Sequence, residues 1–466
     1  MSGKQLQGII RTIQDVYIPP YFETLDKDKL ENAYLNGNID EALKAEWSPQ
    51  VVLPLLALIG DAKTGRKAYL VGNPGTGKTL LLEILPSLVY AVPPAIIERT
   101  ILKGNPDETW ENIVGVLDVG KLQKGETRVL WDPRWLIANI GYMGIDELNR
   151  FSPRVQNQLI QLADTTGDLA LSLYGDFIRV SSRPSVIATG NPFDINGVYK
   201  TSQALLDRFD IGIPYVAPPV FLDEIIEYRQ KEIKDKLDES KFVQRFDNIL
   251  NKFHRREKSL DELVEEANSL RYEYSDYMKQ QGIYVMNPDE LKKIKEEIRK
   301  TEIDKDVKDT MQVLSLVLNY PKSEEDLPSR YFRGEIFTGR SYQSLNWLVR
   351  AMKWYFDSIG VNINDKEILE KALPYVLFHR SFNLATQEGL AEVKETNQYR
   401  EGMDYLYYWD LAKMVSKEAI EKVDSIVEAL REYNDNIPTA IAMMRVSYKK
   451  SGMVDDRLKL ILFYLQ

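Results

Sequence analysis

The chain has 466 residues, 44% of them hydrophobic, and a formal net charge of −10 at pH 7. At about 150 residues a domain, this is enough for roughly two to four domains with ordinary buried cores. The absence of cysteine excludes disulfides and thiolate metal sites, and two histidines, His254 and His379, make a histidine zinc site improbable. The acidic balance argues against a surface devoted mainly to nucleic acid.

Two features of the sequence predict a protein without a membrane span. The longest apolar run, Val51 to Ile59, is interrupted by Pro54 and is far too short to cross a bilayer. The first residues also lack the apolar stretch of a signal peptide. We therefore expect a soluble, cytoplasmic protein.

The first half of the chain predicts a helical segment followed by an α/β domain. Residues 1–50 have a helical pattern that is interrupted at Pro19-Pro20 and ends at Ser48. Over residues 51–219 short apolar strands alternate with helices, which is typical of a mainly parallel sheet with helices on both faces. The predicted strands are Ala68–Gly72, Ile97–Leu102, Tyr142–Asp146, Val186–Gly190 and Ile211–Pro214.

After Pro218-Pro219 the chain becomes highly charged and helical. We expect a helical insertion at 220–286, an α-helical lid at 287–385 and a helical extension at 386–466. In the insertion, apolar residues at helical spacing predict the seam of a helical hairpin, although an arm that grips a partner is an alternative: Leu237, Phe242, Phe246, Ile249, Leu250 and Phe253.

The most specific motif is G-x-x-x-x-G-K-T, between a predicted strand and a predicted helix. Glycines let such a loop curl until its N–H groups point at phosphates, next to the positive end of the helix. Lys78 is expected to neutralise phosphate oxygens, and the Thr79 hydroxyl to bind Mg²⁺. The predicted nucleotide-binding residues are Gly72, Asn73, Pro74, Gly75, Thr76, Gly77, Lys78, Thr79 and Leu80.

Polar side chains at three later positions could complete a catalytic site. The strand Tyr142–Asp146 ends in two carboxylates, so that Asp146 could hold Mg²⁺ and Glu147 could act as the general base for water. Asn191, before Pro192 at the end of a later strand, could position that water. Arg208, before the last strand, could reach the γ-phosphate in a neighbouring subunit.

Together these segments resemble the MoxR family of AAA+ ATPases. The resemblance rests on the P-loop (Walker A), Asp146-Glu147-Leu148-Asn149-Arg150 (Walker B, D-E-x-N-R), Ala188-Thr189-Gly190-Asn191-Pro192 (sensor 1) and Leu206-Asp207-Arg208-Phe209 (arginine finger). Residues 169–180 are similar to the hairpin inserted in helix 2 of the family, with a turn at Tyr174-Gly175-Asp176. Gly339-Arg340-Ser341 resembles its sensor 2.

The resemblance implies a role for each of these residues. Lys78 and Thr79 would bind phosphate and Mg²⁺, Asp146 would bind the metal, and Glu147 would be the base. Asn191 would be sensor 1, Arg208 the finger acting in trans, and Arg340 the sensor 2 contact in cis. The sequence departs from the family in two ways, since Gly190 stands where Gln is frequent and the usual Ser-Pro does not precede Arg340. Arg154 is a second candidate for the finger.

The resulting functional hypothesis is a ring-forming ATPase, a homo-oligomer expected to be hexameric. With ATP and Mg²⁺ it would remodel a client protein in a chaperone-like way, and the resemblance implies a partner with a von Willebrand factor A domain. A nucleic-acid motor similar to MCM helicases is the alternative, against which the acidic balance argues. A nucleotide-locked scaffold without turnover is a third possibility.

Overall fold

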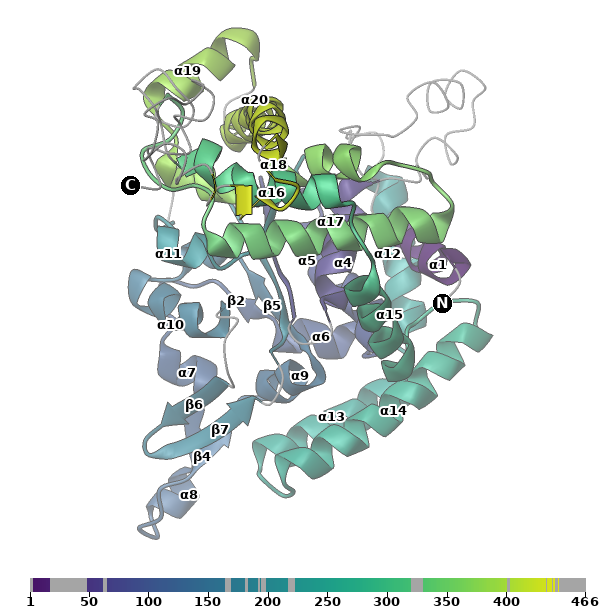
Figure 1. Cartoon of the computed structure of the whole chain (residues 1–466). Coiled ribbons are helices and arrows are strands. Elements are labelled where there is room, and N and C mark those ends of the chain that lie inside the picture. Colours follow the sequence, from purple (N-terminus) through teal and green to yellow (C-terminus); the bar gives the residue numbers. More distant parts are fainter. Residues whose placement is uncertain are drawn as a thin grey trace. The chain divides into compact units, whose positions relative to one another are not determined.

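A computed structural model shows how these segments fold (Figure 1). It describes residues 3–16, 48–61, 65–163, 169–180, 183–191, 193, 198–216, 223–319, 330–399, 403–432, 434–437, 439–440 and 443. Pro192 and the predicted breaks at Pro19-Pro20 and Pro218-Pro219 lie outside these residues. The chain divides into two compact units, one of Met1–Phe209, Ile213–Lys300 and Ser358–Gly360, the other of Asp210–Gly212, Thr301–Asp357 and Val361–Gln466.

The first unit is built on a five-stranded sheet with the order β2-β5-β8-β1-β9. Its strands are β1 (Lys67–Gly72), β2 (Leu102–Lys103), β5 (Tyr142–Asp146), β8 (Ser185–Gly190) and β9 (Ile211–Tyr215). The pairs β1–β8, β5–β8 and β2–β5 are parallel, with Val71 opposite Gly190 and Ile145 opposite Ala188. Every residue of β1, β8 and β9 is buried, as expected for strands covered on both faces.

Four of the five predicted strands are confirmed to within one residue at each end. The prediction of a strand at Ile97–Leu102 is wrong, since residues 94–100 form helix α6 (Pro94–Thr100) and β2 begins at Leu102. Pro93 and Pro94 start this helix, and Pro94 occupies the first helical position, where its fixed φ is favourable. A short buried apolar run does not by itself distinguish a helix from a strand.

Helices cover the sheet and supply the loops around it. They are α4 (Pro49–Ile59), α5 (Lys78–Tyr90), α7 (Trp110–Val114), α9 (Arg134–Ile140), the 3₁₀ turn η1 (Leu148–Arg150), α10 (Pro153–Ala163) and α11 (Gln203–Leu206). All eleven residues of α4 are buried, and it packs against β1 and β8. The longest apolar run of the sequence is therefore a core helix.

Two small hairpins extend from the sheet (Figure 1). One pairs β3 (Gly115–Leu117) with β4 (Val129–Trp131) and carries α8 (Val119–Leu122) between them. The other pairs β6 (Leu169–Leu173) with β7 (Asp176–Val180), which confirms the predicted hairpin. Its turn residues Tyr174 and Gly175 both have positive φ, as a tight two-residue turn requires.

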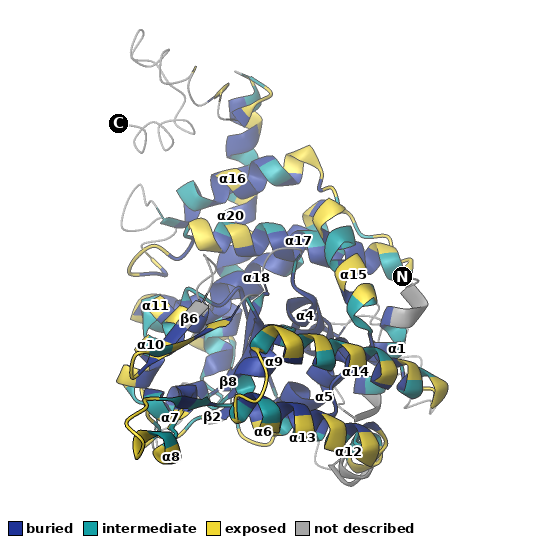
Figure 2. Ribbon diagram, turned by 90° about the horizontal axis from the view of Figure 1, so that it is seen from below, coloured by how far each residue is buried: buried dark blue, intermediate teal, exposed yellow. Residues whose placement is uncertain are grey.

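The charged insertion consists of α12 (Asp223–Leu237), α13 (Ser240–His254), α14 (Leu260–Gln280) and α15 (Pro288–Lys300), and α1 (Gly3–Val16) packs on α12. Helices α13 and α14 lie side by side, and a capping box of Ser259 and Glu262 begins α14. The predicted seam is confirmed for α13, because Phe242 contacts Tyr274 and Tyr277 of α14 and the other apolar residues predicted for the seam are also buried, including Leu237 at the end of α12. Figure 2 shows that α13 and α14 each have buried and exposed residues. The alternative of a partner-gripping arm stays a prediction.

The second unit is helical, with α16 (Lys305–Asn319), α17 (Gly339–Ile359), α18 (Asp365–Leu384), α19 (Gln387–Thr396) and α20 (Tyr405–Arg431). Trp409 of α20 packs on Tyr375 of α18, with 4.7 Å between ring centroids, and on Phe378. The aromatic residues at the start of α20 therefore contribute to a hydrophobic core. In the part of the chain that the structure describes, no helix is long and apolar enough to span a bilayer.

Candidate nucleotide-binding site

The predicted phosphate-binding loop joins β1 to α5. Gly75 and Gly77 have φ of 76° and 80°, a conformation that residues with a Cβ rarely adopt. Gly77 is the N-cap of α5 and Lys78 is its first residue. The unpaired N–H groups of the first helical turn therefore lie beside the loop, where an anion would be stabilised.

The Lys78 side chain folds back onto its own loop. Its Nζ donates to the carbonyls of Gly72 (2.8 Å) and Asn73 (2.6 Å) and to the Thr76 hydroxyl (2.8 Å). Burial lowers the pKa of Lys78 to about 8, while the negative charges of Asp146 and Glu147 oppose that shift. A phosphate would give this buried ammonium an anionic partner that loop carbonyls and a hydroxyl do not supply.

The ends of β5 and β8 bring the Asp146 and Glu147 carboxylates next to the loop that follows β1. The Thr79 hydroxyl, in the first turn of α5, donates to Asp146 at the end of β5 (3.2 Å). Thr189 of the adjacent strand β8 donates to Asp146 Oδ1 (2.5 Å) and accepts a hydrogen bond from the Glu147 N–H (2.9 Å). The Thr189 hydroxyl thus orients both acidic residues.

Glu147 has an unusual backbone conformation and a charged neighbour. Its φ of 54° lies in the left-handed region, which is uncommon for a residue with a side chain and is found at functional sites. Its carboxylate pairs with Arg150 Nε (3.0 Å), and both side chains are about half exposed. In this arrangement Arg150 holds the carboxylate that is predicted to activate water.

Asn191 links the end of β8 to the loop. Its Nδ2 donates to Asn73 Oδ1 (3.1 Å). The backbone of Asn191 is held in turn by Asn149, whose side-chain Nδ2 donates to the Asn191 carbonyl (2.7 Å) and whose Oδ1 accepts from the Asn191 N–H (3.2 Å). The structure therefore places the five predicted residues in two neighbouring hydrogen-bonded groups. Thr79, Asp146 and Glu147 are joined through Thr189, and Lys78 and Asn191 are joined through Asn73.

The predicted arginines lie on other elements. Arg208 follows α11 and its Nη1 donates to the Ala204 carbonyl (2.7 Å). Arg154 is 80% exposed at the start of α10, with a distant partner in Glu111 at 3.8 Å. Arg340 is exposed in the first turn of α17, in the helical unit. These positions leave the assignment of the finger and of sensor 2 as predictions.

Comparison with known proteins identifies the domain that carries this cluster. Residues 67–211 match the family model AAA_3, described as "ATPase family associated with various cellular activities (AAA)". The MoxR resemblance of the sequence therefore coincides with a match to this AAA family over residues 67–211. The matched residues run from the first residue of β1 to the first residue of β9, so they include the whole P-loop cluster.

Two individual proteins resemble the chain. The uncharacterized protein YeaC of Bacillus subtilis is 27% identical over 159 residues, which are 34% of this chain and 44% of YeaC. The chain therefore aligns with less than half the length of this curated relative. A crystal structure of a protein of Cytophaga hutchinsonii, assigned as an ATPase, covers 84% of this chain and 90% of its own length, with a TM-score of 0.47 and 15% identity.

Several residues of this AAA cluster have roles that sequence reasoning missed. Thr189 and Asn149 both stand inside quoted motifs, yet their partners are 42 or 43 residues away in sequence. Arg150 also belongs to a motif, and its position three residues after Glu147 could have indicated that the two side chains form an ion pair. No local sequence pattern indicated a role for Tyr69, because its contact with Gly190 depends on how β1 packs against β8.

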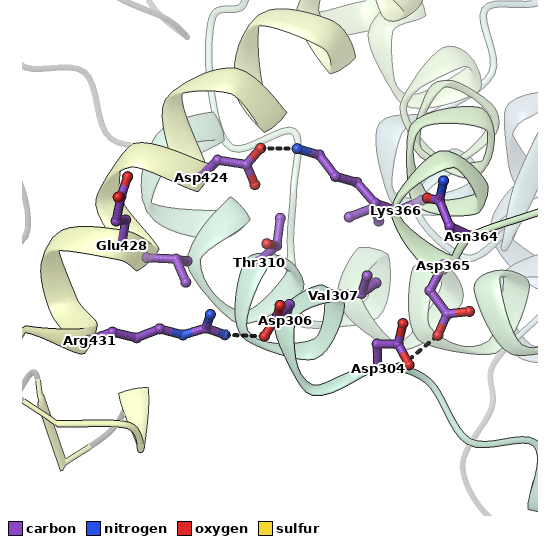
Figure 3. A pocket seen from close by; sticks show the side chains of 12 residues that line it. Asp304, Asp306, Val307, Thr310, Asn364, Asp365, Lys366, Asp424, Glu428 and Arg431 are labelled. Carbon is purple, nitrogen blue, oxygen red and sulfur yellow. Dashed lines mark hydrogen bonds and ion pairs between the residues drawn. The ribbon is translucent and has the colours of Figure 1, made fainter.

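The helical unit has a separate cavity of about 370 Å³, which lies among α16, α18 and α20 (Figure 3). It is rich in carboxylates, but the basic groups that line it pair with them. Lys366 contacts Asp424 (2.6 Å) and Arg431 contacts Asp306 (2.8 Å). These ion pairs join α16 and α18 to α20, so the charged side chains that line the cavity serve to hold the helices together.

Proposed function

We propose that this chain is an ATPase that hydrolyses ATP with the help of Mg²⁺, and that it works as a ring which remodels other proteins. The observation that carries the proposal is the convergence of Lys78, Asp146 and Glu147 beyond the carboxyl ends of β1 and β5, the two strands on either side of β8. Open α/β sheets bind their ligands at this edge. The match of residues 67–211 to a family of ATPases supports the same conclusion.

The oxygen atoms beside the loop are suitable for Mg²⁺. The Thr79 hydroxyl and the Asp146 carboxylate lie 3.2 Å apart, and both are hard oxygen donors. Within the described residues, no group of three or more histidines or acids is arranged to hold a metal ion. Magnesium would bind through the Thr79 and Asp146 side chains together with phosphate and water, which is its usual mode at nucleotide sites.

The cluster suggests how the chain itself would assist hydrolysis. Lys78 would leave the loop carbonyls to contact the phosphates, and Asn191 would turn from Asn73 towards the γ-phosphate or the attacking water. Glu147 would accept a proton from that water. To do so, the Glu147 carboxylate has to break its ion pair with Arg150. The ion pair is exposed, so breaking it costs about 0–1 kcal/mol of free energy.

Ring assembly is the part of the proposal that depends on Arg208. A guanidinium from the next subunit would stabilise charge on the transferring phosphoryl group, so a single subunit would be an incomplete enzyme. A hexamer, a sensor 2 role for Arg340 in cis, and a partner with a von Willebrand factor A domain are expectations from the family resemblance.

Exposed apolar side chains on the two hairpins support a protein client. Of the seven large apolar side chains that are exposed in the described ranges, five are on these hairpins: Val116, Val119, Leu122, Tyr174 and Phe177. The two hairpins touch, because the Val129 N–H donates to Asp176 (3.2 Å). Apolar side chains favour contact with protein, whereas a nucleic-acid surface would present mainly lysine and arginine.

The test is steady-state ATP hydrolysis by the wild-type chain and by Glu147→Gln. The variant keeps the shape of the side chain but not its basicity, so turnover should fall by about 10²–10⁴-fold while ATP affinity changes little. Glu126→Gln, an exposed glutamate on the β3–β4 hairpin, is the matched control and should leave turnover unchanged. Equal turnover by wild type and Glu147→Gln would refute the assignment of Glu147 as the general base. No turnover by wild type at any protein concentration would refute the proposed ATPase activity.

A further inference from the structure

The amide nitrogen and the amide oxygen of the Asn149 side chain both form hydrogen bonds to one residue, Asn191. Asn149 lies in η1, directly after the two acidic residues, and is 2% exposed. Its amide nitrogen donates to the carbonyl of Asn191 (2.7 Å), and its amide oxygen accepts from the N–H of the same residue (3.2 Å). A carboxamide is the side-chain group that offers a donor and an acceptor side by side in this way.

This pair of hydrogen bonds acts where the chain leaves the sheet. β8 ends at Gly190, so the backbone groups of Asn191 are no longer held by the strand ladder and need other partners. Asn149 supplies both partners, and its own carbonyl accepts from the N–H of Tyr199 (2.7 Å). The peptide of Asn191 is thereby fixed relative to the end of β5, which carries Asp146 and Glu147.

We propose that Asn149 is a positioning residue that aims the side chain of Asn191 at the phosphate-binding loop. The inference rests on the proposed ATPase function. Because its N–H and carbonyl are both hydrogen-bonded, Asn191 can change its position mainly by rotating its side chain. Its Nδ2 already donates to Asn73 Oδ1 (3.1 Å). Asn149 itself contacts neither the loop nor the carboxylates through its side chain, so its effect on catalysis would pass through Asn191.

A positioning role and a merely structural role predict different kinetics. A misplacement of about 1 Å in a group that orients the reacting atoms can lower the rate about 10²-fold. Loss of Asn149 should therefore lower kcat by about 10–100-fold while KM and ATP affinity change by less than about threefold. A side chain needed for folding alone would instead lower the melting temperature and leave the kcat of the folded fraction unchanged.

The experiment compares Asn149→Leu, which removes both hydrogen bonds at similar volume, with Asn191→Ala and the double variant. If Asn149 acts through Asn191, the double variant has the same kcat as Asn191→Ala, because coupled residues are not additive. Asn149→Asp keeps the acceptor for the Asn191 N–H and should recover part of the rate. It also carries the test if Asn149→Leu does not fold.

Asn139→Leu is the matched control, since Asn139 is also buried (7% exposed) and its Nδ2 donates to the Trp135 carbonyl in α9 (2.8 Å). Hydrogen exchange of the Asn191 amide gives a readout independent of turnover, and Asn149→Leu should accelerate it. Wild-type kcat in folded Asn149→Leu and Asn149→Asp, or additive losses in the double variant, would overturn the inference and leave the ATPase proposal intact. A wild-type chain without ATP turnover would overturn both.

Discussion

The hydroxyl of Tyr69 occupies the space that a side chain at position 190 would need. A Cβ on Gly190 would meet this hydroxyl within contact distance and would lie 2.9 Å from Asn149 Oδ1. Tyr69 is held in place by Phe209, with 5.3 Å between ring centroids. The glycine that departs from the family resemblance is therefore explained by the packing of β1 against β8.

Gly190→Ala should consequently destabilise the protein. Forcing a methyl group into a filled space costs about 1–3 kcal/mol, and urea unfolding would measure the loss of unfolding free energy. Tyr69→Phe removes the hydroxyl and should recover part of this loss in the double variant. Gly120→Ala is the control, because its nearest neighbour would be 3.4 Å away. Equal stability of the Gly190 and Gly120 variants would contradict this explanation.

ATP affinity should depend on pH through Lys78. Because the pKa of Lys78 is lowered to about 8, the ammonium loses its charge as pH rises through this value, and affinity should fall between about pH 7 and 9.5. A bound phosphate favours the charged form, so binding near pH 8.5 should take up protons, which calorimetry in buffers of different ionisation enthalpy detects. Lys78→Arg stays charged in this range and should show no such dependence.

Without nucleotide, the same shift has the opposite consequence for folding. Lysine in the unfolded chain keeps its proton up to about 10.5, whereas folded Lys78 releases it near 8. Between these values the unfolded state binds more protons, so this group adds stability as pH rises from about 8 to about 10.5. A wild-type stability that shows no gain over Lys78→Arg across this interval would contradict the lowered pKa.

The trans role of Arg208 can be tested with mixed subunits. Arg208→Ala alone should lose activity to a degree similar to Glu147→Gln, because charge on the phosphoryl group is no longer stabilised. Mixing the two variants should restore part of the activity, since some interfaces then combine an intact Glu147 with an intact Arg208. If rings assemble but activity stays absent, the finger lies elsewhere, and Arg154 is the next residue to test.

The tip of the α13–α14 pair should stabilise both β hairpins. Arg256 forms an ion pair with Asp176 in the β6–β7 hairpin, and Arg128 of the other hairpin donates to the Arg255 carbonyl (2.6 Å). Exposed ion pairs contribute about 0–1 kcal/mol, so Arg256→Glu should speed amide exchange in β6 and β7 by up to about fivefold.

Reversing the pair gives the stricter test of this contact. The double variant Arg256→Glu with Asp176→Arg should return exchange in β6 and β7 towards the wild-type rate. Lys258→Glu is the control, because Lys258 pairs with Glu266 within the α13–α14 pair itself and should leave the hairpins unaffected. Equal exchange in Arg256→Glu and wild type would show that this ion pair does not stabilise the hairpin.

The middle of α14 illustrates what the sequence did not reveal. Arg271 of α14 is buried, and its Nε donates to the carbonyl of Tyr90 at the end of α5 (2.5 Å). A cation is favourable there because the carbonyls at a helix C-terminus lack partners and carry partial negative charge. Burial still lowers the pKa of Arg271 to about 10. The charge pattern of 220–286 predicted helices but not this contact with the P-loop helix.

The sequence by itself determined the features that depend on neighbouring residues. Glycines at fixed spacing, a lysine and threonine at a helix start, and acidic residues at a strand end are local patterns with local causes. The tertiary structure decided which distant residues meet. Thr189 reaches Asp146, Asn149 reaches Asn191, and Tyr69 fills the space at Gly190, because parallel strands place segments far apart in the chain side by side. It also decided that residues 94–100 are a helix, since burial satisfies an apolar run equally well in either secondary structure.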